Sequence, residues 1–277
     1  MARSTSRGST SRRLRVPARG RFRLRGEDAD DVEACRGGKT RAEKEIGTLR
    51  NELDRLQELL YADHRFALLV VLQGMDTAGK DGTIRHVFAG LNPQGVHVAS
   101  FRVPTAEESE HDFLWRVHPH APGRGRIAIF NRSHYEDVLV PRAHRTLSRA
   151  AWEARCRAVR AFERSLAVNG TRIVKFFLHI DAKEQRRRLD ERRADPHKRW
   201  KLSAADERER RYWGRYQKAY EEVIRRTDAA WAPWYIVPSN AKWFRNWAVS
   251  RILVETLRTL PLRYPSLPPG IDAGEAR

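Results

Sequence analysis

Two glycines and a lysine have the spacing of a phosphate-binding loop. Gly74, Gly79 and Lys80 form a Gly-x-x-x-x-Gly-Lys pattern, which follows an apolar run from Phe66 to Leu72. Glycines let backbone N–H groups close around phosphate oxygens, the next helix points its positive N-terminus at them, and the lysine adds a full charge. The pattern therefore predicts a site for a nucleotide or another phosphate compound at the end of a buried strand.

An aspartate inside this loop indicates a further role. Asp76 lies between the two glycines, where its carboxylate would repel a phosphate unless a cation offsets the charge. We expect Asp76 to be a catalytic or metal-positioning acid; the alternative is a residue that only shapes the turn. Asp81 follows the lysine, where an ordinary loop of this kind has the Ser or Thr that holds magnesium. This departure disfavours a routine ATPase or GTPase, although Thr83 has a hydroxyl one turn along.

A second polar segment follows the third expected strand. Residues 130–138 read FNRSHYEDV, and Asn131 stands where a protein with such a loop often has an aspartate. Arg132 offers a guanidinium suited to bidentate phosphate contacts, and Glu136 is one of two acids close by. Arg132 could instead form a structural salt bridge, but its place at the end of a strand favours ligand binding.

A basic segment, RRRLDERRADPHKRWK, covers residues 186–201 after the fourth expected strand. We expect a helix to begin after it at Ser203, with Asp206 as a capping acid. Such a run is often only a solvated helix face. Its place between two helices at a strand end favours a lid over about residues 186–212, which would stabilise the charge of a moving phosphoryl group.

These residues need a scaffold that brings strand ends together. Strand-like runs occur at 67–73, 96–103, 126–131, 171–180 and 234–238, with helical or loop sequence between them. The alternation predicts βαβ units, an α/β fold and a mostly parallel five-stranded sheet, with ligands beyond the carboxyl ends of its strands. Apolar residues three and four apart predict helices around 46–60 and 152–166.

Two other sets of residues have weaker signals. His118 and His120 lack a third ligand at a suitable spacing, so we expect surface or packing roles for them rather than a metal site. Aromatic residues from Trp213 to Tyr220 recur at helical spacing with Val223, which favours core packing or an oligomer contact over a nucleobase platform.

The chain is strongly basic. Its 277 residues include 54 Lys and Arg against 35 Asp and Glu, a net charge of +19. Nine of the arginines and no acid lie in residues 1–26. This charge favours a polyanionic partner: nucleic acid, an anionic membrane or an inorganic phosphate chain. We expect residues 1–37 to be a disordered basic tail, or else an accessory grip on a polyanion, 38–262 to be the domain, and 263–277 to be a C-terminal tail.

Cysteines and apolar segments restrict the protein class. Cys35 and Cys156 are far apart and form no C-x-x-C pair, which disfavours a disulfide framework and a cysteine zinc site. The longest apolar run is far shorter than the ~20 residues of a membrane span, and the Arg-rich start lacks the apolar stretch of a secretory signal. We expect a cytoplasmic protein without membrane contact.

Six sequence blocks together resemble the polyphosphate kinase 2 family, phosphotransferases that move a phosphoryl group between inorganic polyphosphate and nucleotides. In order, they are GMDTAGKDGTIRHV, LNPQGVHVASF, HDFLWRVH, IAIFNRSHYEDVLV, DPHKRWKLS and APWYIVPSNAKWFRNW, and they lie within residues 41–260. The resemblance implies a P-loop kinase-like, three-layer α/β/α sandwich with a helical lid. It also implies a magnesium cofactor, with manganese as the substitute, and a homodimer or homotetramer.

The resemblance also implies roles for individual residues. Asp76 and Lys80 match the family's essential loop pair, Arg132 its phosphate-binding arginine, and three residues of the basic segment its lid cations. Asp76 would position the metal. Asn131 resembles the branch associated with phosphorylating AMP as well as ADP. We therefore expect phosphate or nucleotide contacts from Gly74, Ala78, Gly79, Asp81, Gly82, Thr83, Asn131, Glu136, Arg192, Lys198 and Lys201.

These observations predict a polyphosphate-dependent nucleotide kinase. It would transfer the terminal phosphoryl group of polyphosphate directly, in line, to AMP or ADP, and ATP would be a product. The alternative is an ATP-dependent small-molecule kinase on the same scaffold. A more remote alternative is a non-enzymatic nucleic-acid binder, which the basic charge alone suggests; the absence of stacking and groove-reading motifs disfavours a specific nucleic-acid partner.

Overall fold

The computed structural model describes residues 9–17, 22–202 and 208–266. The strands are β1 (Ala67–Gln73), β2 (Val96–Ser100), β3 (Ile127–Asn131), β4 (Thr171–His179) and β5 (Trp234–Pro238). The helices are α1 (Thr10–Leu14), α2 (Gly38–Asp63), α3 (Lys80–Val87), α4 (Ala106–Glu110), α5 (Glu136–His144), α6 (Arg149–Val168), α7 (Ala182–Ala194), α9 (Trp213–Thr227) and α10 (Lys242–Leu257). Short 3-10 helices include η1 (Glu27–Asp30) and η4 (Arg199–Lys201).

The five strands form one parallel sheet in the order β2-β3-β1-β4-β5. Every residue of the central strand β1 is buried, as expected for a parallel sheet covered on both faces. The prediction of a mostly parallel sheet is confirmed. β2 ends at Ser100, earlier than expected, and Val103 beyond it is 89% exposed.

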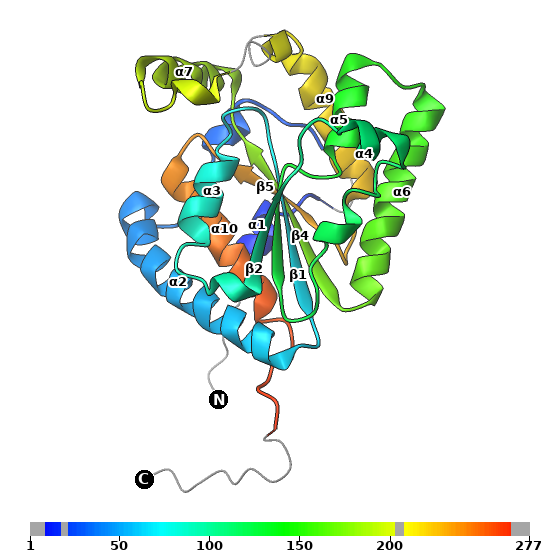
Figure 1. Ribbon diagram of the computed structural model, residues 1–277. Helices are drawn as coiled ribbons and strands as arrows, with labels where there is room; N and C mark the ends of the chain where they lie inside the picture. The colour runs from blue at the N-terminus through cyan, green and yellow to red at the C-terminus, as the bar shows by residue number, and fades with distance from the viewer. Residues whose placement is uncertain (1–8, 18–21, 203–207, 267–277) are drawn as a thin grey trace, which may run out of the picture.

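Helices cover both faces of the sheet (Figure 1). On one side α10 packs against α2 and α3, and on the other α5, α6 and α9 pack against one another. This arrangement confirms the three-layer α/β/α sandwich. The carboxyl ends of all strands point toward the edge where α7 lies, so the loops after β1, β3 and β4 meet there.

The N-terminal segment differs from the expected disordered tail. In its described part, α1 lies on α10, where the Ser9 hydroxyl and the Ser11 amide donate to the carboxylate of Glu255. Leu14 and Val16 are buried in the main core. The prediction is therefore wrong for residues 9–17 and 22–37, because a few apolar side chains among the arginines suffice to dock the segment.

Two further observations concern the rest of the chain. None of the described helices combines the length and the apolar character needed to cross a membrane. The expected helix start at Ser203, with its capping Asp206, lies outside the described residues.

Candidate active site

The loop between β1 and α3 needs glycine at two positions. A Cβ atom at Gly74 would lie 2.7 Å from the backbone oxygen of Leu178 on β4. Gly79 has a φ of 102°, in the left-handed region, and a Cβ there would lie 1.9 Å from Nη1 of Arg245. The loop is therefore packed tightly between β4 and α10, which holds its backbone N–H groups in place.

Lys80 opens α3 and is buried, with 9% of its surface exposed. Its ammonium donates to the backbone oxygens of Gly74 and Met75, at 2.7 and 3.4 Å. Burial, together with the positive charge of Arg132, lowers the pKa of Lys80 to about 8, while Asp76 acts in the opposite direction. A phosphate bound here would raise this pKa again and keep the lysine charged, so the lysine is suited to anion binding.

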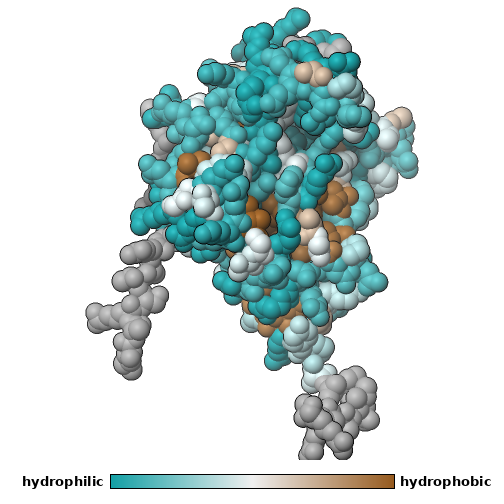
Figure 2. Space-filling view, turned by 90° about the vertical axis from the view of Figure 1, so that its left-hand side faces the viewer, coloured by the Kyte–Doolittle hydropathy of each residue, from teal (hydrophilic) through white to brown (hydrophobic). Residues whose placement is uncertain are grey.

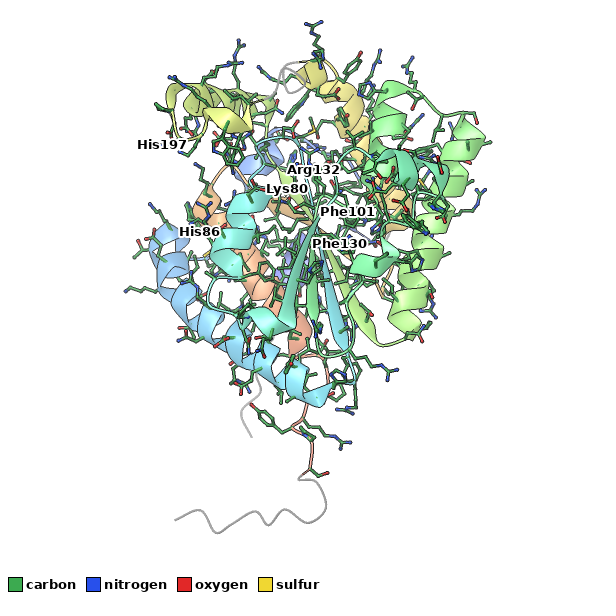
Figure 3. All side chains as sticks on the ribbon, viewed as in Figure 1. Lys80, His86, Phe101, Phe130, Arg132 and His197 are labelled. Carbon is green, nitrogen blue, oxygen red and sulfur yellow. The ribbon has the colours of Figure 1, made fainter. Side chains whose placement is uncertain are left out.

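Asp76 and Arg132 form an ion pair across the mouth of the loop. Nη2 of Arg132 lies 2.9 Å from Oδ1 of Asp76, and its Nη1 lies 3.8 Å from Oε2 of Glu136. Arg132 itself has a left-handed φ of 64°. Burial raises the pKa of Glu136, although Arg132 and Lys80 counter it. Figure 3 shows Lys80 and Arg132 close together beyond the end of the sheet, with His197 farther out on the predicted lid segment.

Asp81 links the phosphate loop to the predicted lid segment. Nδ2 of Asn131 donates to its Oδ1 at 2.9 Å, and Nζ of Lys201 lies 3.0 Å from its Oδ2. Burial opposes ionisation, but these two contacts lower the pKa of Asp81. The hydroxyl of Thr83 donates to the oxygen of Gly79 at 3.0 Å within α3. Asp81 therefore occupies the usual Ser or Thr position with a contact to the lid.

The structure brings most of the predicted residues together, but not two of the lid cations. Lys198 pairs with Asp195 inside the lid at 2.6 Å. Arg192 is half-buried on α7. Among the described residues, no hydrogen bond or ion pair joins either of them to the phosphate loop, so of the three predicted lid cations only Lys201 contacts it.

Arg188 is a residue that the sequence reasoning overlooked. Its Nη1 donates to the oxygens of Thr77 and Ala78, at 2.9 and 3.1 Å, and its Nη2 to those of Ser239 and Asn240, at 2.6 and 3.1 Å. One guanidinium on α7 thus ties the phosphate loop to the end of β5.

Two other side chains assist Arg188. On α7, Gln185 donates to the oxygen of Asp76 at 3.4 Å, and on α10, Arg245 donates to that of Ala78 at 3.3 Å. A signal existed in the sequence: Gln185, Arg188 and Leu189 have the three-and-four spacing of the buried face of α7, and all three are buried. Polar residues on a buried helix face must have partners.

A buried charge cluster anchors the turn after β3. Nζ of Lys175 lies 2.6 Å from Oε2 of Glu163 and donates to the Tyr135 hydroxyl at 3.0 Å. Nε2 of His134 lies 3.3 Å from Oε1 of the same glutamate. His134 and Tyr135 directly follow Arg132 and Ser133 in the chain, so the cluster fixes the turn that presents Arg132 to the loop.

The acids of the loop are compatible with a magnesium ion shared with substrate. No group of three or more His, Cys, Asp and Glu side chains in the described ranges could hold a metal alone. Magnesium is usually bound through one or two carboxylates, waters and substrate phosphates. The side chain of Asp76 is 27% exposed, and one of its carboxylate oxygens forms the ion pair with Arg132. Its other carboxylate oxygen is available to bind a metal ion. His118 instead packs against Phe162, and His120 against His97 and Phe101.

Comparisons with known proteins identify the family of this chain. A sequence model of the family described as Polyphosphate kinase 2 matches residues 37–262. The chain is 54% identical over 254 residues to the AMP/ADP-polyphosphate phosphotransferase of Meiothermus ruber, and the aligned region covers 92% of this chain and 95% of that protein. It is 46% identical over 236 residues to the ADP-polyphosphate phosphotransferase of Rhodopseudomonas palustris, with 80% and 82% covered.

A solved structure agrees as well. The crystal structure of polyphosphate kinase 2 from Arthrobacter aurescens TC1 matches with a TM-score of 0.91 at 39% identity, covering 96% of this chain and 94% of that one. Sequence and structure therefore confirm the resemblance, and the chain belongs to the polyphosphate kinase 2 family.

Proposed function

We propose that this protein is a polyphosphate-dependent nucleotide kinase, which transfers the terminal phosphoryl group of inorganic polyphosphate to AMP or ADP. The observation that carries the proposal is the ion pair of Asp76 with Arg132 at the mouth of a phosphate loop whose Lys80 is buried. The family and the names of the relatives from Meiothermus ruber and Rhodopseudomonas palustris support the substrates.

Phosphate binding falls to the loop and its lysine. The N–H groups around Gly74, Gly79 and Gly82 and the N-terminus of α3 would hold phosphate oxygens, while Lys80 would exchange its two backbone acceptors for a phosphate. Arg132 would contact the moving phosphoryl group. Lys201 already lies at the loop, and the lid cations Arg192 and Lys198 would approach when the lid closes.

The transfer step is a direct displacement. An oxygen of the AMP phosphate, or of the ADP β-phosphate, forms a bond to the terminal phosphorus while the bridging P–O bond breaks, and the shortened chain leaves with the electron pair. Asp76 would orient the acceptor, and Arg132 and Lys80 would stabilise the charge on the equatorial oxygens. Magnesium, or manganese as its substitute, would be held by Asp76 and phosphate oxygens and would withdraw charge from them.

One assay tests this function. The purified protein is incubated with magnesium, polyphosphate and AMP, ADP or GDP, and higher phosphates are followed by chromatography. We expect ADP and ATP to form from AMP. Turnover that needs ATP as the donor, with polyphosphate neither supporting nor inhibiting it, would favour the ATP-dependent kinase; salt-sensitive binding of duplex without turnover would favour a nucleic-acid binder.

Two properties of the protein as a whole complete the proposal. We expect a homodimer or homotetramer, which rests on the family resemblance. We also expect a cytoplasmic protein, which the two cysteines, both free and buried in the structure, support. Light scattering after size exclusion measures the assembly.

A further inference from the structure

A cavity of about 450 Å³ lies between the N-terminal segment, the start of α2 and α10. None of the residues that line it belongs to the phosphate loop, the turn after β3 or the lid. We call it the arginine cavity because five arginines line it: Arg12, Arg13, Arg36, Arg41 and Arg251. Its volume is within the range of ligand sites.

The arginine cavity has more positive charge than its acids neutralise. Two carboxylates line it, against five guanidinium groups. Glu33 pairs with Arg13 at 2.5 Å, and Glu45 pairs with Arg41 at 2.7 Å and lies 3.7 Å from Arg251. Arg251 also pairs with Glu255, just outside the lining, at 3.3 Å. Two positive charges of the lining, those of Arg12 and Arg36, are therefore not compensated, a charge distribution that attracts an anion.

Two of the arginines, Arg12 and Arg36, are exposed and pair with no acid of the described residues. Placing these two charges beside the other guanidinium groups does not stabilise the fold, because like charges at close range repel one another. The guanidinium groups of Arg12 and Arg36 remain available to a ligand.

The lining favours phosphates over nucleobases. Guanidinium groups match phosphate oxygens in geometry and charge. Trp247, the aromatic residue of the lining, is 4% exposed and donates its indole N–H to Glu45 at 2.8 Å, so it offers no open face for a base to stack on. Figure 2 shows that the face carrying α2 and α3 is mainly hydrophilic, which suits an extended anion in solvent.

We propose that the arginine cavity binds a run of inorganic phosphates and so holds a long polyphosphate chain at a second point, away from the transfer site. Binding requires only the charges of the cavity, whereas the benefit to turnover rests on the proposed function. When a polyphosphate chain is bound at the arginine cavity, its binding to the phosphate loop becomes intramolecular. This raises the affinity only for chains that are long enough to reach both sites.

The test is a double substitution, Arg12→Ala with Arg36→Ala, in the full chain. It leaves no carboxylate unpaired, so the fold should be retained. The matched control is Arg124→Ala with Arg157→Ala, which removes the same charge from exposed sites before β3 and on α6. Calorimetry without nucleotide should show the Kd for long polyphosphate rising at least about fivefold in the cavity variant and less than about twofold in the control.

Salt dependence and chain length sharpen the result. The slope of the logarithm of the association constant against the logarithm of the salt concentration should become shallower by about 1.4 in the cavity variant. Each of the two lost contacts accounts for ~0.7, as in single-stranded nucleic acids. KM for long polyphosphate should rise, while kcat and KM for tripolyphosphate stay unchanged. Equal binding by the cavity and control variants would overturn the proposal, and so would a loss of affinity for ADP or single-stranded RNA instead of polyphosphate.

The two proposals fail in different ways. If the protein has no polyphosphate-dependent turnover but the cavity variant still loses affinity for the long chain, the proposed function is wrong and the arginine cavity stands. If turnover is present and the long-chain Kd is the same in both variants, the cavity proposal is wrong and the proposed function stands.

Discussion

Replacing Arg188 with lysine should loosen the phosphate loop while keeping the charge on α7. The guanidinium donates to four backbone oxygens in two separate places, those of residues 77 and 78 and those of residues 239 and 240. A lysine ammonium is a single point with three N–H groups, so it can serve only one of the two places. The other pair of carbonyls then loses its donor.

The size of the effect follows from those two bonds. Hydrogen bonds to a charged group contribute ~1.5–3 kcal/mol each, and water that enters the gap offsets part of the loss. We expect Arg188→Lys to lower the free energy of unfolding by about 2–4 kcal/mol. For a domain of this size, the Tm should fall by roughly 5–15 °C. A displaced loop should also lower kcat, by about tenfold to a hundredfold.

Arg187→Lys is the matched control. Arg187 precedes Arg188 on α7, but its side chain is half-exposed and pairs only with Glu184 and Glu191 among the acids of the helix. Such surface pairs contribute little, so its free energy of unfolding should stay within ~0.5 kcal/mol. Thermal and urea denaturation measure stability, and turnover with polyphosphate measures kcat. If Arg188→Lys is as stable and active as Arg187→Lys, the tie between α7 and the loop is not important.

Two other perturbations test the buried charges. Because the pKa of Lys80 is about 8, a rise in pH through 8 removes the charge of the lysine. The affinity of the wild-type protein for tripolyphosphate should therefore fall by up to ~10-fold per pH unit relative to Lys80→Arg, whose side chain stays charged. If calorimetry gives parallel pH profiles of affinity for the two proteins, this prediction is contradicted. Lys175→Met leaves the carboxylate of the buried Glu163 without its lysine partner, and should lower the free energy of unfolding measured with urea by ~3–5 kcal/mol. Adding Glu163→Leu should recover most of that loss, and a single variant of unchanged stability would show that the pair is unimportant.

The strands and the loop could be predicted because their signals are local. β1 and β5 were predicted to the residue, since β1 is an unbroken apolar run and Pro238 closes β5. The carboxyl-end rule then placed Asp76, Lys80 and Arg132 together.

The rest depends on contacts between distant parts of the chain. Arg188 donates to carbonyls 111 and 51 residues away, and backbone partners leave no trace in a sequence. In the N-terminal segment, Leu14 and Val16 are too few for a periodic pattern, although both are buried against the domain. Lys198 pairs inside the lid, so the charge run alone did not distinguish it from Lys201.

Phosphorus NMR tests the central claim most directly, because it follows donor and acceptor together. The protein is mixed with polyphosphate, magnesium and AMP, and Asp76→Asn is measured beside it. We predict that every phosphate lost from the chain appears on a nucleotide, and that Asp76→Asn loses most turnover while its far-UV circular dichroism and Tm are retained. Normal turnover in Asp76→Asn, or nucleotide phosphorylation without loss of chain phosphate, would contradict the account.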